Sequence, residues 1–169
     1  MGVNRGKQFE DAIKDAFEAV PGVSIDRFQD PMAGYAGISN ICDFVVYQYP
    51  TQNYFECKSC YGNTLSIHSN DPKNKYGAIT NTQWEGLLEK SPIPGVKAGI
   101  LVWFIDHDIT AFVDIRTLVE LKNSGAKSLH VKHLWEKRIP YVLVPGRKKR
   151  VLFEYDAHSF LIGLYYFDL

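Results

Sequence analysis

Residues 41–60, ICDFVVYQYPTQNYFECKSC, form the most informative segment of this 169-residue chain. Its two halves, Ile41–Tyr49 and Asn53–Cys60, are rich in β-branched and aromatic residues, and Pro50-Thr51-Gln52 separates them. Such runs favour extended strands, and a short connection that contains proline is typical of a turn. The segment therefore predicts a β-hairpin.

Three charged residues interrupt these apolar runs. Side chains alternate along a strand, so Glu56 and Lys58 are expected on one face of the hairpin, while Phe55 and Cys57 point toward a core. Asp43 is expected on the neighbouring strand. Two carboxylates from adjacent strands suit a hard cation such as Mg²⁺, and a lysine beside them suits a water nucleophile or a phosphate oxygen. The pattern indicates phosphodiester cleavage.

Length and composition predict one domain, residues 1–169. Hydrophobic residues make up 46% of the chain and aromatic residues 14%, which is enough to fill a core. Nineteen basic and nineteen acidic side chains cancel, so any contact with DNA must come from local patches. The sequence contains neither a membrane-spanning apolar run nor a signal-peptide pattern, so we expect a cytoplasmic protein without membrane contact.

The cysteines raise a zinc alternative. Cys57 and Cys60 form a CxxC pair, and Cys42 and His68 could supply two further ligands. This CxxC begins in the middle of a strand rather than in a turn, and the odd number of thiols disfavours disulfides. We therefore expect Cys42 and Cys57 to be small apolar fillers.

Helical spacing of apolar residues predicts an amphipathic helix over residues 6–20, which Pro21-Gly22 ends. Glu10 lies at the edge of its apolar face, where it could be a solvated first-turn acid or reach inward to a metal. A second helix is expected from Thr80 to Lys90, with Gln83 in its first turn. The other expected elements are strands over 23–28, 98–105, 109–115, 141–144 and 151–155, and helices over 116–122, 128–137 and 156–167.

Two groups of basic residues are candidates for contacts with the DNA backbone. The polar segment 61–80 reads as a long loop and contains Lys73 and Lys75. The strongest positive patch lies in the expected turn between the last two strands and consists of Arg147, Lys148, Lys149 and Arg150.

The arrangement of these residues resembles the PD-(D/E)xK nuclease superfamily. Asp43 and the Glu56-x-Lys58 motif follow a helix that carries Glu10 and precede a helix that opens with Gln83, while Cys42 stands where the superfamily has proline. The resemblance implies a restriction-endonuclease-like α/β core, with a mixed central β-sheet flanked by helices. Within the superfamily the order is similar to the RecU-type Holliday junction resolvases of Gram-positive bacteria and their phages. The matching pieces are Asn4-Arg5-Gly6, Phe9-Glu10, Cys42-Asp43-Phe44, Phe55-Glu56-Cys57-Lys58, Gln83 and the basic stretch followed by the last helix.

The resemblance also implies roles for these residues. Asp43, Glu56 and the main-chain carbonyl of Cys57 would hold Mg²⁺, with Mn²⁺ as a possible substitute. Lys58 would orient or deprotonate the attacking water. Glu10 would complete a second metal position or hold a metal-bound water, and Gln83 would fix Lys58 or the water.

The function implied is resolution of four-way DNA junctions by paired symmetric nicks, carried out by a homodimer in the cytoplasm, or in the host cytoplasm if a phage encodes the chain. The segment 21–41 is shorter than the arm that cellular members insert into the junction centre. Two alternatives therefore stay open: a nuclease of this superfamily that acts on duplex or flap DNA, and a non-catalytic DNA-binding protein of the same fold.

Overall fold

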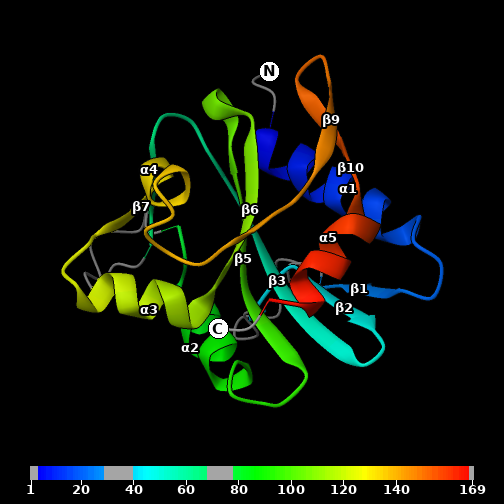
Figure 1. Ribbon diagram of the computed structural model, residues 1–169, viewed down its shortest axis with the longest axis horizontal. Helices are drawn as coiled ribbons and strands as arrows, with labels where there is room; N and C mark the ends of the chain where they lie inside the picture. The colour runs from blue at the N-terminus through cyan, green and yellow to red at the C-terminus, as the bar shows by residue number, and fades with distance from the viewer. Residues whose placement is uncertain (1–3, 29–39, 68–77, 168–169) are drawn as a thin grey trace, which may run out of the picture.

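A mixed six-stranded sheet is the centre of the computed structural model, which describes residues 4–28, 40–67 and 78–167 (Figure 1). The strands lie in the order β1-β2-β3-β5-β6-β8. Their bounds are β1 Ser24–Arg27, β2 Phe44–Gln48, β3 Thr51–Cys60, β5 Val96–Phe104, β6 Ile109–Asp114 and β8 Val142–Leu143. β3 and β5 run parallel, and the other neighbours are antiparallel. The predicted α/β class with a mixed central sheet is confirmed.

Helices α1 (Arg5–Glu18) and α5 (Ala157–Tyr165) cover one face of this sheet (Figure 1). The buried residues of α1 are Phe9, Ile13 and Phe17, and the Phe17 ring stacks on Phe55 of β3 with 5.7 Å between ring centroids. The Asn4 side chain begins α1 by accepting a hydrogen bond from Lys7 N at 3.1 Å. The predicted first helix and its apolar face are therefore confirmed.

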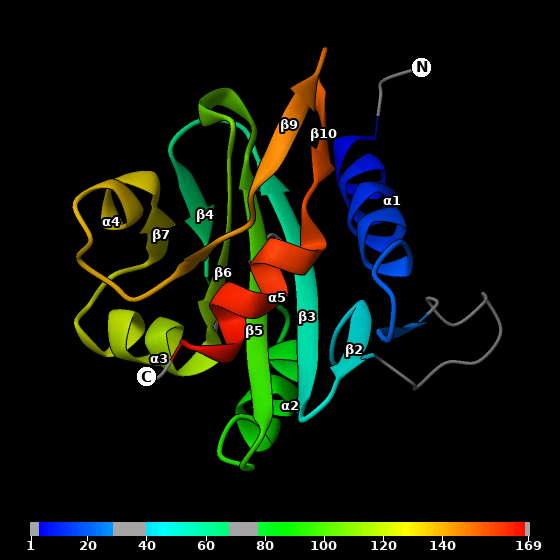
Figure 2. The ribbon, with the colours of Figure 1, turned by 45° about the vertical axis from the view of Figure 1, so that its right-hand side comes forward.

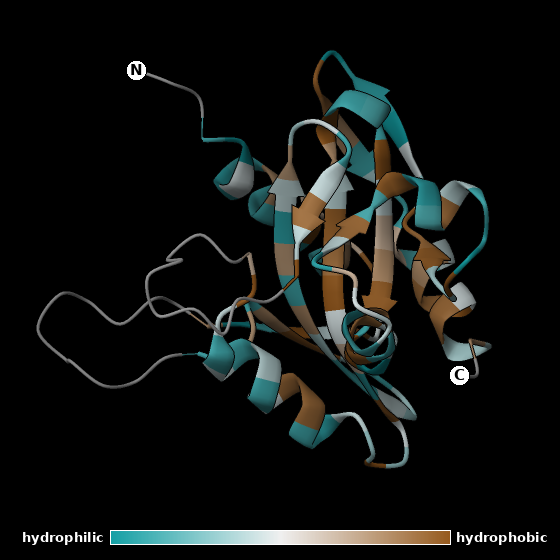
Figure 3. Ribbon diagram, turned by 90° about the vertical axis from the view of Figure 1, so that its left-hand side faces the viewer, coloured by the Kyte–Doolittle hydropathy of each residue, from teal (hydrophilic) through white to brown (hydrophobic). Residues whose placement is uncertain are grey.

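The opposite face is covered by α2 (Asn81–Lys90), α3 (Ile115–Asn123) and α4 (Val131–Trp135). Their buried side chains, among them Leu87, Leu118 and Leu134, form one core cluster with Ile100 and Val102 of β5. Hydrophobic residues accordingly concentrate in the central strands (Figure 3). β5 is buried on both faces because helices cover both, as the nearly continuous apolar run of its sequence predicts.

Two small antiparallel sheets correct the predictions for local structure. β4 (Thr64–Ser66) pairs with β7 (Ser128–His130), although 61–80 was predicted as loop and 128–137 as one helix. The buried side chains of Leu65 and Leu129 face each other in this pair. Each strand has three residues, too few for a local pattern, so only their mutual pairing makes them strands.

β9 (Gly146–Lys149) pairs with β10 (Leu152–Tyr155), so most of the basic stretch is strand rather than the predicted turn. The short 3-10 segment η1 (Ile105–His107) and Asp108, which has a left-handed conformation, connect β5 to β6. Figure 2 shows the β9–β10 hairpin rising beside the amino-terminal end of α1. Within the described ranges, no helix combines the length and the apolar composition needed to cross a membrane.

Candidate active site

Asp43 lies directly before β2 and is fixed to β3 by its backbone and its side chain. Its N–H donates to the carbonyl of Phe55 at 3.1 Å, and its Oδ2 accepts from the N–H of Cys57 at 2.7 Å. Because Phe44 pairs with Phe55 in the ladder, Asp43 lies opposite Glu56. The predicted hairpin is therefore confirmed. It places Asp43, just before β2, opposite Glu56 on β3.

Glu56 and Lys58 lie on the face of β3 that packs toward α2. Glu56 is only 3% exposed, and its Oε1 is 2.7 Å from Lys58 Nζ. Gln83 Nε2 donates to the same oxygen at 2.7 Å. Two donors therefore hold one carboxylate oxygen of Glu56.

The second oxygen of Glu56, Oε2, is buried and has no hydrogen-bond partner. Two other buried polar atoms in the described part of the chain share this condition, on Asn53 and Trp103, and both belong to neutral groups. A buried acceptor without a partner costs about 1–3 kcal/mol, and more when it is charged. Such an oxygen is suited to a cation.

The position of Gln83 follows from the start of α2. Thr80 is the N-cap residue: its Oγ1 accepts from Gln83 N at 3.3 Å, while Gln83 Oε1 accepts from Thr80 N at 3.0 Å. This capping box fixes the amide of Gln83, so its Nε2 faces β3. Gly86, one turn later, allows close packing, because a Cβ there would lie 2.3 Å from Ile41 Cγ2.

The pKa of Glu56 is raised, mainly because this side chain is buried. Burial raises the pKa of this carboxyl from 4.5 to about 8, Lys58 opposes the rise, and the negative charge of Asp43 adds to it. Perturbed carboxyls of this kind are common at functional sites, because a fold does not otherwise benefit from a buried acid.

Glu10 is placed at the edge of this group and is engaged by a residue that the sequence reasoning missed. Arg27 Nη2 of β1 lies 2.7 Å from Glu10 Oε2, and Arg27 Nη1 lies 3.1 Å from Asp11 Oδ1. Burial, and then the charge of Asp43, raise the pKa of Glu10. A signal existed in the sequence, because Arg27 continues the inward-facing alternation of Val23 and Ile25.

Among the described residues, the thiols do not come together with other ligand side chains as a metal-holding group. Burial raises the pKa of Cys42 to about 12 and that of Cys60 to about 11. All three cysteines are free, and Cys42 donates to the carbonyl of Phe44 at 3.4 Å. His68 lies outside the described residues.

The basic residues of β9 are exposed but already have acidic neighbours. Glu154 Oε2 lies 2.9 Å from Arg147 Nη2 and 2.6 Å from Lys149 Nζ, and Asp108 Oδ2 lies 2.5 Å from Lys148 Nζ. Arg150 follows in the turn with a positive φ of 55°.

The contact of Lys148 with the β5–β6 connection places the β9–β10 hairpin at the end of the sheet toward which β3 runs. Cys60, the last residue of β3, pairs with Phe104, the last residue of β5, just before that connection. The basic side chains of β9 therefore lie beyond the Lys58 end of the strand that carries Glu56. Lys73 and Lys75 lie outside the described residues.

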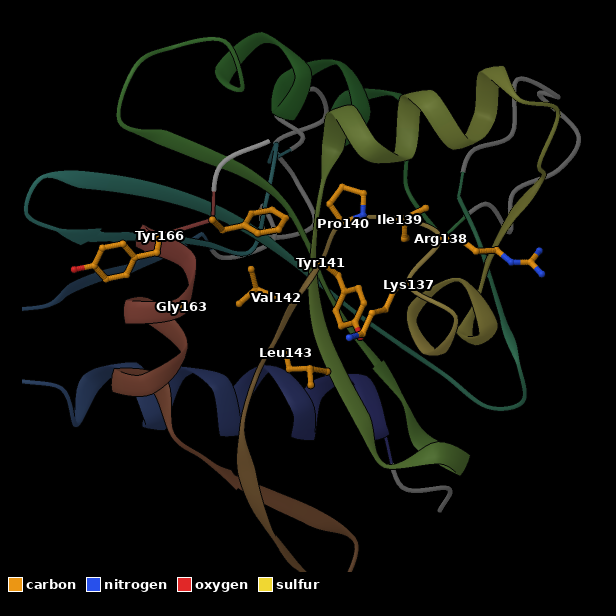
Figure 4. Close-up of a pocket in the computed structure, with 10 residues that line it drawn as sticks. Lys137, Arg138, Ile139, Pro140, Tyr141, Val142, Leu143, Gly163 and Tyr166 are labelled. Carbon is orange, nitrogen blue, oxygen red and sulfur yellow. The ribbon is translucent and has the colours of Figure 1, made fainter.

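A surface hollow of about 730 Å³ lies elsewhere, between the segment that leads into β8 and α5 (Figure 4). Figure 4 shows Tyr141, Val142 and Leu143 along one side, Gly163 on α5, and Tyr166 directly after that helix. None of the candidate site residues lines it.

The donor set fits Mg²⁺ better than a metal that needs an all-protein cage. Among the described residues, no three His, Cys, Asp or Glu side chains come together as a metal-holding group. Mg²⁺ is commonly bound through one or two carboxylates, with water and phosphate oxygens completing its shell. Asp43 and Glu56, with the unpartnered Oε2, meet that requirement.

No protein-family model and no curated protein matches this chain. Among solved structures, the chain is similar to Hjc, a Holliday junction resolvase from the archaeal hyperthermophile Archaeoglobus fulgidus. The two sequences are 19% identical, the similarity covers 66% of this chain and 78% of that one, and the TM-score is 0.44. A similarity of this extent assigns no function to this chain.

Proposed function

We propose that this chain is a Mg²⁺-dependent endodeoxyribonuclease. One observation carries the proposal: the Glu56 carboxylate is buried opposite Asp43, two donors hold its Oε1, and its Oε2 has no partner. The large majority of buried side-chain polar atoms have a partner, so an unpartnered oxygen on a buried acid favours a cation site. The arrangement leaves one carboxylate oxygen ready for a cation.

Each site residue has a role in this proposal. Asp43 and Glu56 hold Mg²⁺, and the main-chain carbonyl of Cys57 is the third protein ligand. When bound, the metal lowers the pKa of a water and neutralises charge on the scissile phosphate. Lys58 Nζ, already a donor to Glu56, positions the water or a phosphate oxygen through its remaining hydrogens. Gln83 holds Glu56 in one orientation.

DNA contact is assigned to the basic residues of β9 and the turn after it, which are exposed at the end of the sheet toward which β3 runs. Lys73 and Lys75 remain further candidates. A phosphate can replace Glu154 or Asp108 as the partner of these cations at small cost, since exposed ion pairs contribute little stability.

The substrate proposed is the four-way DNA junction, by the sequence resemblance to RecU-type resolvases. Two symmetric nicks require two sites related by a two-fold axis, so the active species would be a homodimer. Mn²⁺ would substitute for Mg²⁺, and the cytoplasm is the expected location.

The rival is a non-catalytic DNA-binding protein, which the Glu56–Lys58 ion pair favours, since such a pair can be structural. The melting temperature, measured as Mg²⁺ is added, distinguishes the nuclease from the non-catalytic protein. A metal site raises the melting temperature as Mg²⁺ is added, whereas a structural ion pair does not respond.

The test of the proposed function is cleavage of a synthetic four-way junction in Mg²⁺, beside linear duplex, single strand and flap DNA of matched sequence. We expect paired nicks in the junction, lost in Asp43→Asn and Lys58→Ala with DNA binding retained. Lys90→Ala, which removes a half-buried lysine of α2 that pairs with Glu89, is the matched control and should cut like wild type. Equal cutting of all substrates would replace the resolvase by a general nuclease, and cutting by Lys58→Ala would remove the site assignment.

A further inference from the structure

Arg27 of β1 has two carboxylate partners, both on α1. Its Nη2 lies 2.7 Å from Glu10 Oε2 and its Nη1 3.1 Å from Asp11 Oδ1, so the guanidinium bridges two consecutive acids of α1. About 29% of the Arg27 side chain and 27% of the Glu10 side chain are exposed. The pair is therefore screened less by solvent than a surface ion pair.

Strand β1 also brings Arg27 close to the residue that follows Asp43. Arg27 pairs with Phe44 in the β1–β2 ladder, and its guanidinium carbon is 5.7 Å from the centre of the Phe44 ring. The next residue, Phe28, donates its N–H to the carbonyl of Asp43 at 2.9 Å. The Arg27 guanidinium thus lies over Phe44, the residue that follows Asp43.

We propose that Arg27 limits this site to one divalent cation, by holding Glu10 as its own partner so that Glu10 is not a metal ligand. The inference rests on the proposed function and adds the number of metal ions that the site binds. The metal is held by Asp43 and Glu56, and Arg27 takes the place that a second ion would need.

The chemistry of arginine suits this role. Its guanidinium keeps its charge at any physiological pH and presents a planar fork that binds two acids at once. A second Mg²⁺ would have to break both contacts and then lie within a few ångströms of that fixed charge. Mg²⁺ also loses its own water reluctantly, so such an exchange is unfavourable.

Glu10 and Glu56 differ in the way that this role requires. Glu10 Oε2 is occupied by a donor of fixed charge, whereas Glu56 Oε2 is buried without a partner. Both acids are near Asp43, but only one retains an unpartnered buried oxygen.

Mn²⁺ binding without DNA tests the inference, measured by equilibrium dialysis and calorimetry on the full chain. We expect one Mn²⁺ per chain in wild type, two in Arg27→Gln, and one again in Arg27→Gln/Glu10→Gln. Arg116→Gln, which removes an arginine paired with Asp114 at another place, is the matched control and should bind one. Melting in EDTA checks that each variant is folded.

Glu10→Gln alone gives an answer that does not depend on the stability of Arg27→Gln. Loss even of an outer-shell partner of a metal ligand weakens metal affinity by about tenfold or more, so loss of a ligand would cost at least as much, whereas we expect a change of no more than about twofold here. Two ions in wild type, one in Arg27→Gln, two in the double variant, or a tenfold loss in Glu10→Gln would each overturn the inference and leave the nuclease standing. No binding by wild type would instead overturn the proposed function.

Discussion

Replacing Glu56 by glutamine should stabilise this protein and, under the proposed nuclease function, abolish cleavage. Glu56 is 3% exposed, and burial is the main cause that raises its pKa from 4.5 to about 8. The positive charge of Lys58 opposes this rise, and the negative charge of Asp43 adds to it. Glutamine has the shape of the protonated acid, and its amide oxygen can still accept from Gln83 and Lys58. The substitution therefore removes the charge and preserves the hydrogen bonds of Oε1.

The magnitude follows from linkage between protonation and folding. The folded protein holds the Glu56 proton more tightly than the unfolded chain, so ionisation of Glu56 destabilises the fold. This destabilisation is absent well below pH 4.5, grows as pH rises, and is complete above about pH 8. A tenfold difference in proton affinity corresponds to about 1.4 kcal/mol, which gives roughly 3 kcal/mol at pH 7 and close to 5 above pH 9.

Thermal and urea unfolding in EDTA, from pH 5 to pH 9, measure this difference. Glu56→Gln should exceed wild type by somewhat less than about 1 kcal/mol at pH 5 and by roughly 3 kcal/mol at pH 7, which for a chain of this length is about 6–12 °C in melting temperature. Glu89→Gln is the matched control, since Glu89 is 75% exposed on α2, and should show no such dependence on pH.

A variant that is less stable than wild type at pH 7, with a difference that does not grow with pH, would refute the reasoning. It would mean that the Glu56 charge is well accommodated by Lys58 and Gln83. The burial of the Glu56 charge would then give no support to a cation site.

Three other perturbations test neighbouring parts of the structure. Gly86→Ala should destabilise the protein by about 1–3 kcal/mol in urea unfolding, because the new Cβ would lie 2.3 Å from Ile41 Cγ2; an increase in stability would show that helix propensity outweighs this clash. Glu154→Gln should tighten binding to duplex DNA and steepen its salt dependence by about 0.9 for each cation released, measured by fluorescence anisotropy; unchanged binding would mean that DNA already displaces Glu154. Mg²⁺ should raise the melting temperature of wild type but not of Asp43→Asn, and an equal rise in both would place the ion elsewhere.

Local sequence determined much of the framework around the site. The β-branched and aromatic runs in 41–60 predicted the hairpin, and alternation placed Glu56 and Lys58 together, because side-chain direction in a strand depends only on position. Threonine at position 80 predicted the start of α2, and that start fixes Gln83 at the third helical position. These features need only a few consecutive residues.

Tertiary structure alone decided which charges meet. Arg27 and Glu10 are 17 residues apart, and only the packing of β1 beside α1 brings them together. β4 and β7 become strands by pairing with each other across more than sixty residues, and the basic stretch becomes β9 because β10 lies beside it. The unpartnered oxygen of Glu56 likewise depends on which side chains reach it. Periodicity fixes the direction of a side chain, whereas its partner is set by contacts between distant segments, which no local pattern contains.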